Sequence, residues 1–257
     1  MIENQIHTDL MKFEPISLAE MDSLKLMNRL DNKFVFSVNQ LHEVLEKAAY
    51  HYRVLEINNQ REFFYYTKYF DTQDWFFFNE HQTGRADRYK IRMRTYEVNN
   101  LSYLEIKHKT NKGNTKKSRI KIPNTEELTD EGKEFIKTKV GIDADKLRIS
   151  SVNGFRRITL ASFVTQERIT IDHTLSFASN GRNINLDKLC IAEVKRDRSS
   201  SRTPIVDIMK DVHGQNTGLS KYCLGISYLN DNVRQNEFKP KKLLINKIEQ
   251  DDFFRSK

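Results

Sequence analysis

The sequence predicts an α+β fold in which antiparallel strands predominate. Segments rich in Tyr, Phe, Ile and Thr recur along the chain, and several of them carry a basic residue at every second position. Three or four segments with apolar residues at helical spacing interrupt these strands. We therefore expect a large antiparallel sheet or barrel with flanking helices.

The first part of the chain predicts two helices and three strands. Ser17 and Glu20 form a capping-box pattern, which starts a helix over Ser17–Leu30. A second, amphipathic helix is expected at Val38–Ala49. The strands are expected at Lys33–Val38, Arg53–Ile57 and Phe63–Asp71.

The remainder of the chain predicts further strands joined by short turns. Turns are expected at Asn99-Asn100 and at Asn111–Asn114. A helix over Glu126–Val140 should stop at Gly141, because glycine readily adopts the left-handed conformation that ends helices. Two more helices are expected, at Asp207–Val212 and Leu243–Phe254. The strands are Arg88–Tyr96, Ser102–Lys109, Ser118–Ile122, Val152–Ala161, Arg168–Asp172 and Cys190–Arg196.

The length, charge and cysteine content of the chain indicate its domain count, its kind of partner and its compartment. A chain of 257 residues can form one large domain, and a net charge of +8 favours anionic partners such as nucleic acid, phosphorylated molecules or an anionic membrane surface. Cys190 and Cys223 lack metal-site spacing, and they fit a reduced cytoplasmic chain better than a disulfide scaffold. No window approaches 18 uninterrupted apolar residues, so we expect a cytoplasmic protein without a transmembrane segment.

The alternating basic residues are the most informative pattern. Lys90, Arg92 and Arg94 alternate with Ile91 and Met93, so one face of that strand is cationic and the other apolar. Other strands repeat the pattern with Glu105/Lys107, Lys117/Arg119/Lys121, Arg168/Thr170/Asp172 and Glu193/Lys195.

The charged faces point either to solvent or to a shared ligand. A sheet with one wet face is common. Like charges side by side cost energy, however, and a bound polyanion would neutralise them. Glu193 or Glu105 among the cations would supply the oxygen ligand that Mg²⁺ or Mn²⁺ needs to bridge phosphates. The isolated glycines form no phosphate-cradling loop of the Walker type.

At these residues the chain resembles a known family, the VTC domain. This domain is the polyphosphate-polymerase module within the triphosphate tunnel metalloenzyme (CYTH-like) superfamily. The resemblance spans roughly Leu24 to Tyr228. Its motifs, in chain order, are Arg29–Phe34, Tyr69–Thr72, Lys90–Tyr96, Leu104–Lys107, Lys117–Arg119, Phe155–Arg157, Arg168–Asp172, Ala192–Lys195 and Ser220–Tyr222.

The resemblance implies an antiparallel β-barrel tunnel of about eight strands with flanking helices. The tunnel domain would span residues 24–238, between an N-terminal extension (1–23) and a C-terminal basic segment with a short helix (239–257). The lumen would bind ATP and polyphosphate or triphosphate, with Mn²⁺ or Mg²⁺ as cofactor. The phosphate-binding residues would be Lys33, Arg92, Arg94, Lys107, Lys117, Arg119, Arg157, Arg168, Lys195 and Lys221.

Within this set Arg92, Arg94, Lys107, Arg168 and Lys221 would act in catalysis by stabilising charge, and Glu193 would hold the metal, with Glu105 as a second candidate. Arg156 and Arg157 are adjacent and face opposite ways, so either one could be the tunnel residue.

One motif bears on the choice between the possible activities. The hydrolytic branch of the superfamily begins with Glu-x-Glu-x-Lys, and here Arg29 and Asp31 occupy the two Glu positions before Lys33. Loss of an acidic ligand favours polyphosphate synthesis from the γ-phosphate of ATP over a triphosphatase or NTPase of the same fold. The family's eukaryotic setting involves membrane partners, and the chain's own oligomeric state stays open.

A third reading is a non-catalytic module that binds polyanions or nucleic acid. Such a module commonly stacks bases on exposed aromatic residues, for which Phe63–Tyr66 or Trp75–Phe78 could serve. Packing in the core or at its rim is the commoner role for Trp75–Phe78, and we expect no specific nucleic-acid partner.

Overall fold

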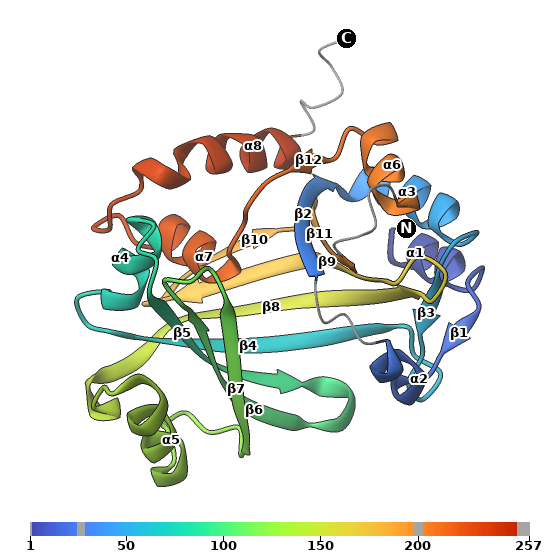
Figure 1. Ribbon diagram of the computed structural model, residues 1–257. Helices are drawn as coiled ribbons and strands as arrows, with labels where there is room; N and C mark the ends of the chain where they lie inside the picture. Colours follow the sequence, from blue (N-terminus) through green and yellow to red (C-terminus); the bar gives the residue numbers. More distant parts are fainter. Residues whose placement is uncertain (1, 25–28, 198–202, 251–257) are drawn as a thin grey trace.

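The computed structural model describes residues 2–24, 29–197 and 203–250 (Figure 1). Its helices are α1 (Ile2–Leu10), α2 (Leu18–Ser23), α3 (Leu41–Ala48), α4 (Phe76–Gln82), α5 (Asp130–Val140), α6 (Pro204–Asp211), α7 (Lys221–Leu229) and α8 (Lys239–Glu249). Its strands are β1 (Pro15–Ile16), β2 (Arg29–Ser37), β3 (Arg53–Leu55), β4 (Glu62–Thr72), β5 (Arg88–Tyr96), β6 (Leu101–Lys109), β7 (Thr115–Ile122), β8 (Leu147–Ser162), β9 (Glu167–Ser179), β10 (Arg182–Leu186), β11 (Leu189–Asp197) and β12 (Gln215–Asn216).

The strands form one 12-stranded sheet, which confirms an α+β fold built on a large antiparallel sheet. Its hydrogen-bonded path runs β12-β2-β11-β9-β8-β4-β5-β6-β7, with β1, β3 and β10 as side branches. Neighbours along the path are antiparallel, and only the short β1–β3 pair is parallel among the described strands.

The expected closure into a barrel of about eight strands is not confirmed. Within residues 2–24, 29–197 and 203–250, no strand pair joins β7 to β12, so the path is open. The segment before α7 lies between the two halves of the sheet: Lys33 of β2 and Lys90 of β5 both bind it, at Leu219 and Ser220 respectively.

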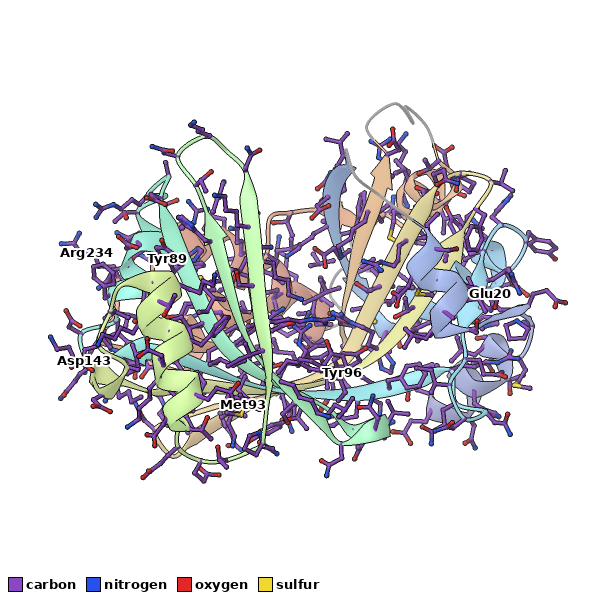
Figure 2. The ribbon with its side chains drawn as sticks, turned by 60° about the horizontal axis from the view of Figure 1, so that its bottom comes forward. Glu20, Tyr89, Met93, Tyr96, Asp143 and Arg234 are labelled. Carbon is purple, nitrogen blue, oxygen red and sulfur yellow. The ribbon has the colours of Figure 1, made fainter. Side chains whose placement is uncertain are left out.

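The sheet is strongly bent, so that two arms face each other (Figure 2). One arm contains β5, β6 and β7, the other contains β9, β11 and β2, and the long strands β4 and β8 run through both. The charges of Lys33 and Glu193 on the second arm affect the pKa of Lys107 on the first arm. The two arms are therefore close to each other across the concave face.

Helices cover the convex face of each arm (Figure 1). Helices α1, α3 and α6 bury the apolar faces of β2, β9 and β11 through residues such as Phe34, Ile171 and Val194. Helix α5 packs through Ile136 against the apolar faces of β5, β6 and β7, which include Leu104. Because apolar side chains occupy the convex face, strand geometry turns the intervening charged side chains toward the concave face.

Two further groups of helices pack at the ends of the concave face. Helices α7 and α8 contribute Leu224 and Ile245 to a cluster with Val35 and Phe155. Helix α2 contributes Met21 to a cluster with the concave-face residue Phe63. The charged middle of the face therefore lies between two apolar ends.

Most predicted elements are confirmed, with some shifts at their ends. The capping box at Ser17 and Glu20 is present, but the expected helix over Ser17–Leu30 is wrong beyond Ser23. Strand β2 begins at Arg29, because nine residues there pair with β11, and residues 25–28 lie outside the described part. The helix expected from Glu126 starts at Asp130, after Thr129 caps its N-terminus.

Elements without strong apolar periodicity escaped prediction. These are the helices α1, α4 and α7 and the short strands β1, β10 and β12. The last helix, expected at Leu243–Phe254, is α8 and ends at Glu249, while residues 251–254 lie outside the described part. Each missed helix is held by tertiary contacts, as Asp71 holds the first turn of α4 by accepting the N–H groups of Phe77 and Phe78.

Candidate functional site

The concave face gathers basic side chains from β2, β5, β6, β7, β8, β9 and β11. Cross-strand partners such as Lys90 and Lys107, or Arg168 and Lys195, lie side by side. The positions on this face are Lys33, Lys90, Arg92, Arg94, Lys107, Lys117, Arg119, Arg157, Arg168 and Lys195. The faces deduced from alternation are therefore confirmed, because the intervening Ile91, Leu104, Ile106 and Ile169 are buried.

Glu105 joins two of these cations. Its Oε2 accepts hydrogen bonds from Arg92 Nε at 2.7 Å and pairs with the guanidinium NH2 at 2.6 Å. Its Oε1 lies 2.6 Å from Lys117 Nζ. Burial alone would raise the pKa of Glu105, but the positive charges of Arg92 and its neighbours outweigh burial and lower that pKa to about 2.

Asp172 forms a second centre of the same kind on the opposite arm. It accepts two hydrogen bonds from Arg157, at 2.5 Å from Nε and 2.8 Å from NH2, and it also pairs with Lys221 at the start of α7. Burial opposes its ionised form, but Arg157 and Lys221 hold the pKa of Asp172 well below its usual range. Bidentate Arg–carboxylate pairs of this kind fix the guanidinium plane as well as its position.

Glu193 lies on the same arm as Asp172, with Lys195 and Lys33 beside it. Its Oε2 is 2.9 Å from Lys195 Nζ, and Lys33 is its cross-strand partner. Burial works against the charged carboxylate, yet Lys195 and Lys33 hold the pKa of Glu193 well below its usual range. Glu193 is therefore ionised at neutral pH and surrounded by cations.

The N-terminal side of α7 binds two lysines of the concave face. Lys33 Nζ donates to the Leu219 carbonyl at 2.8 Å, and Lys90 Nζ donates to Ser220 Oγ at 3.0 Å. Burial and the charges of neighbouring cations, chiefly Lys33 and Lys107, lower the pKa of Lys90 to about 8. Lys33, Lys90 and Lys107 therefore lie close enough for their positive charges to repel one another.

Six cations of the face pair with no carboxylate that the structure describes: Lys33, Lys90, Arg94, Lys107, Arg119 and Arg168. Arg94 is only 9% exposed and lies 5.7 Å from the ring centre of Tyr65. Burial and the charge of Arg92 both lower the pKa of Arg94. An anion bound here would find unneutralised positive charge beside the two carboxylate-centred clusters.

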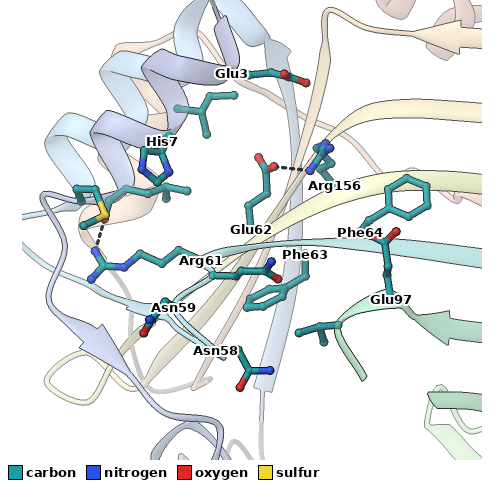
Figure 3. Close-up of a pocket in the computed structure, with 15 residues that line it drawn as sticks. Glu3, His7, Asn58, Asn59, Arg61, Glu62, Phe63, Phe64, Glu97 and Arg156 are labelled. Atoms are coloured by element: carbon teal, nitrogen blue, oxygen red, sulfur yellow. Dashed lines mark hydrogen bonds and ion pairs between the residues drawn. The ribbon is translucent and has the colours of Figure 1, made fainter. Parts of the chain in front are cut away.

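The structure separates Arg156 from Arg157. Arg157 lies on the concave face with Asp172, whereas Arg156 NH1 points to the other side and binds Glu62 Oε2 at 3.0 Å. Figure 3 shows Arg156 and Glu62 in a hollow of about 510 Å³ that α1 and the residues before β4 also line. Of the two adjacent arginines, Arg157 is therefore the one on the face with the other cations.

Sequence reasoning did not identify Asp172 as a site residue, nor Lys90 as a ligand-facing lysine. Both belonged to alternating runs, so the pattern marked their face. The pairing of Asp172 with Arg157 depends on the register between β8 and β9, and its contact with Lys221 depends on where α7 packs. Neither is encoded by spacing along the chain.

The family comparison matches this geometry. A model of the VTC domain family matches residues 28–230, which include α7 and every strand of the sheet except β1. The chain belongs to the VTC domain family. The resemblance drawn from the sequence motifs is thereby confirmed.

Solved structures show the same fold at low sequence identity. A candidate adenylate cyclase from Bacillus halodurans has a TM-score of 0.50 and 12% identity, covering 76% of this VTC domain chain and 94% of its own. A candidate adenylyl cyclase from Hippeastrum, described as having a dominant triphosphatase activity, has a TM-score of 0.50 and 13% identity, covering 79% and 97%. A search among curated proteins gives no match.

Carboxylates that could hold a metal are sparse in this VTC domain. Within the described ranges, no three His, Cys, Asp or Glu side chains come together as a metal site. Glu193 and Asp31 lie on the same face of paired strands as diagonal neighbours, and both act on Lys107 and Lys195. The side chain of Arg29, at the position of the missing glutamate, lies outside the described residues.

These donors fit an ion that is shared with a ligand. Mg²⁺ is usually bound through one or two carboxylates together with substrate phosphates, instead of by a cage made of protein alone. Glu105 could join such a site only by giving up its pairs with Arg92 or Lys117.

None of the helices in the described part of the chain is long and apolar enough to cross a membrane. Cys190 and Cys223 are both buried and free, as expected for a chain without a disulfide scaffold.

Proposed function

We propose that this VTC domain is a metal-dependent phosphotransferase that extends polyphosphate with the γ-phosphate of ATP. The observation that carries the proposal is the pairing of two buried, carboxylate-centred cation clusters across one concave face. Arg92–Glu105–Lys117 stands on one arm and Arg157–Asp172–Lys221 on the other, with the unpaired Arg94, Lys107 and Arg168 on the same face.

Phosphoryl transfer requires mainly alignment and charge stabilisation. A terminal phosphate oxygen of the chain would attack the γ-phosphorus of ATP, and the bond to the β–γ bridging oxygen would break, so that ADP leaves with its electron pair. The acceptor oxygen is already anionic, so no general base is needed. Fixed cations on both arms would hold the donor and acceptor in line and stabilise the charge that develops on the oxygens.

Divalent metal completes the proposed site. Glu193, with Asp31 beside it, would hold Mn²⁺ or Mg²⁺ together with phosphate oxygens, and the ion would neutralise charge on the transferring group. Glu105 is proposed to order Arg92 and Lys117, unless it releases one of them to join the metal.

The test is to incubate the purified protein with ATP and Mn²⁺ and to detect polyphosphate on gels. We expect chain growth by the wild type and none by Arg92→Ala, with Arg182→Ala, an exposed arginine away from the face, as control. Absence of product from the wild type, or equal product from Arg92→Ala, would show that the proposal is wrong.

Hydrolysis of triphosphate is the second candidate. The triphosphatase activity described for the Hippeastrum protein of the same fold supports it. Phosphate release from tripolyphosphate without any chain growth would select this activity. Replacement of the first acidic position of the hydrolytic motif by Arg29 favours synthesis.

A further inference from the structure

A row of tyrosine rings crosses three adjacent strands of the concave face. Tyr65 of β4 and Tyr96 of β5 are cross-strand partners with ring centres 5.1 Å apart. The ring of Tyr103 of β6 lies 5.9 Å from that of Tyr96, edge to face. Figure 2 shows Tyr96 where the two arms of the sheet meet.

The tyrosine row continues the line of cations. On β5 the concave positions are Lys90, Arg92, Arg94 and then Tyr96. Arg94 lies 5.7 Å from the ring centre of Tyr65, and Arg119 lies 4.9 Å from that of Tyr103. The row therefore borders the arginine end of the face, whereas α7 borders the lysine end.

The tyrosines also leave ring surface and hydroxyl groups available to a ligand. All three are half-buried, so part of each ring stays accessible. The hydroxyls of Tyr96 and Tyr103 donate no hydrogen bond to any group in the described part of the chain. Core aromatics of this protein, such as Phe77 and Phe78, are instead fully buried. Partly exposed tyrosine rings beside arginines are the surface on which nucleic-acid bases commonly stack.

We propose that Tyr65, Tyr96 and Tyr103 form a nucleobase subsite, which orients a nucleoside triphosphate on the face. The base stacks on one ring of the row, whose neighbour stands edge to face with it, and the triphosphate extends past Arg94 and Arg92 toward Lys90. Tyr96 and Arg92 are separated by roughly 13 Å of extended strand, which is on the scale of a nucleotide from base to terminal phosphate. This inference rests on the proposed function, because it requires phosphates on the neighbouring arginines.

The subsite distinguishes ATP from inorganic tripolyphosphate, since only ATP carries a base. Binding of both ligands is measured by calorimetry in EDTA, which prevents turnover. We expect the Tyr96→Ala/Tyr103→Ala variant to bind ATP about tenfold more weakly, or by about 1.4 kcal/mol, and tripolyphosphate within about twofold of wild type. Tyr96→Phe/Tyr103→Phe keeps both rings and should keep most of the ATP affinity.

Tyr66→Ala is the matched control, because Tyr66 is the next residue of β4 and faces the opposite side. It should change neither affinity. Equal loss for ATP and tripolyphosphate, or no loss for either, would overturn the subsite while leaving phosphate binding intact. Failure of the wild type to bind tripolyphosphate would overturn the proposed function itself. If the double alanine variant unfolds, Tyr96→Leu and Tyr103→Leu measured singly apply the same criteria.

Discussion

Two deeply buried carboxylates on the concave face each hold two cations. The side chain of Glu105 is 1% exposed and that of Asp172 is 3% exposed, and both have a lowered pKa. Two cations on one carboxylate leave a net positive charge at each cluster. The clusters therefore remain attractive to phosphate while the protein tolerates their burial without a ligand.

Removing the charge of Asp172 should destabilise the fold and make its stability depend more strongly on a bound anion. Asp172→Asn leaves Arg157 and Lys221 without their counter-charge, and loss of one partner from a buried ion pair costs about 3–5 kcal/mol of folding free energy. Tripolyphosphate should restore more thermal stability to this variant than to wild type, because the anion takes the place of the carboxylate. Thermal unfolding with and without tripolyphosphate measures both effects. Asp231→Asn, at an exposed pair with Arg182, should behave as wild type; an equal ligand shift in all three proteins would contradict the prediction.

Lys90 should make phosphate binding depend on pH. Its pKa of about 8 is lowered chiefly by burial, and a bound anion favours the charged lysine and raises that pKa. Affinity for tripolyphosphate should therefore fall as the pH rises through 8, with proton uptake on binding near that pH. Calorimetry in buffers of different ionisation enthalpy measures the uptake. Lys90→Gln should bind more weakly at neutral pH and take up fewer protons, and the ligand's own titration cancels in this comparison. Identical uptake by both proteins would refute the role of Lys90.

At the scale of elements, α7 links the sheet to the candidate site. Lys221 in its first turn binds Asp172, and Ser220 just before it accepts a hydrogen bond from Lys90. The next residue, Tyr222, donates to the buried Asp71, which also holds α4. The position of α7 thus sets the position of Lys221, one of the residues proposed to bind phosphate.

Gly225 allows this close packing of α7. A Cβ there would lie 2.7 Å from Cδ1 of Phe177, so Gly225→Ala must displace the helix or the ring. We expect a loss of about 1–3 kcal/mol in unfolding free energy and weaker tripolyphosphate binding, because Lys221 moves with the helix. Gly218→Ala is the control, since a Cβ at Gly218 meets nothing within 4 Å. Denaturant unfolding and calorimetry measure the two effects, and unchanged binding by a destabilised Gly225→Ala would separate α7 from the site.

At the scale of the whole molecule, two arms of one sheet place carboxylates and cations opposite each other. Only two carboxylates, Glu193 and Asp31, are proposed as metal ligands, and no group of three metal-ligating side chains occurs in the described ranges. The protein alone therefore supplies too few ligands for the metal. The metal and the phosphate chain should then bind together.

This coupling predicts that Mn²⁺ alone hardly changes the melting temperature. Mn²⁺ with tripolyphosphate should raise it by more than the sum of the separate effects, because phosphate oxygens complete the coordination. Glu193→Gln should lose this extra stabilisation and keep the effect of tripolyphosphate, whereas Glu237→Gln, at an exposed glutamate, should keep both. Strong stabilisation of wild type by the metal alone would argue for a preformed metal site.

Much of the sheet could be predicted from local pattern. Strand β5 has its predicted bounds, and β6, β7 and β11 differ by a few residues, because alternating apolar and charged residues suit only a half-buried strand. The helix expected over Ser17–Leu30 failed after its first turns, since pairing of β2 with β11 outweighs helical propensity from Arg29 onward. Helix α7 is buried on most sides and so lacks an amphipathic pattern.

The sequence by itself determined which residues share a face, because side chains in a strand alternate with a period of two. It also carried the motifs of the VTC domain family in their order. Only the tertiary structure decided that Arg157 and not Arg156 joins the concave face, that Asp172 holds Lys221, and that the segment before α7 contacts both β2 and β5. These outcomes depend on strand register and on packing between distant segments, for which local spacing holds no information.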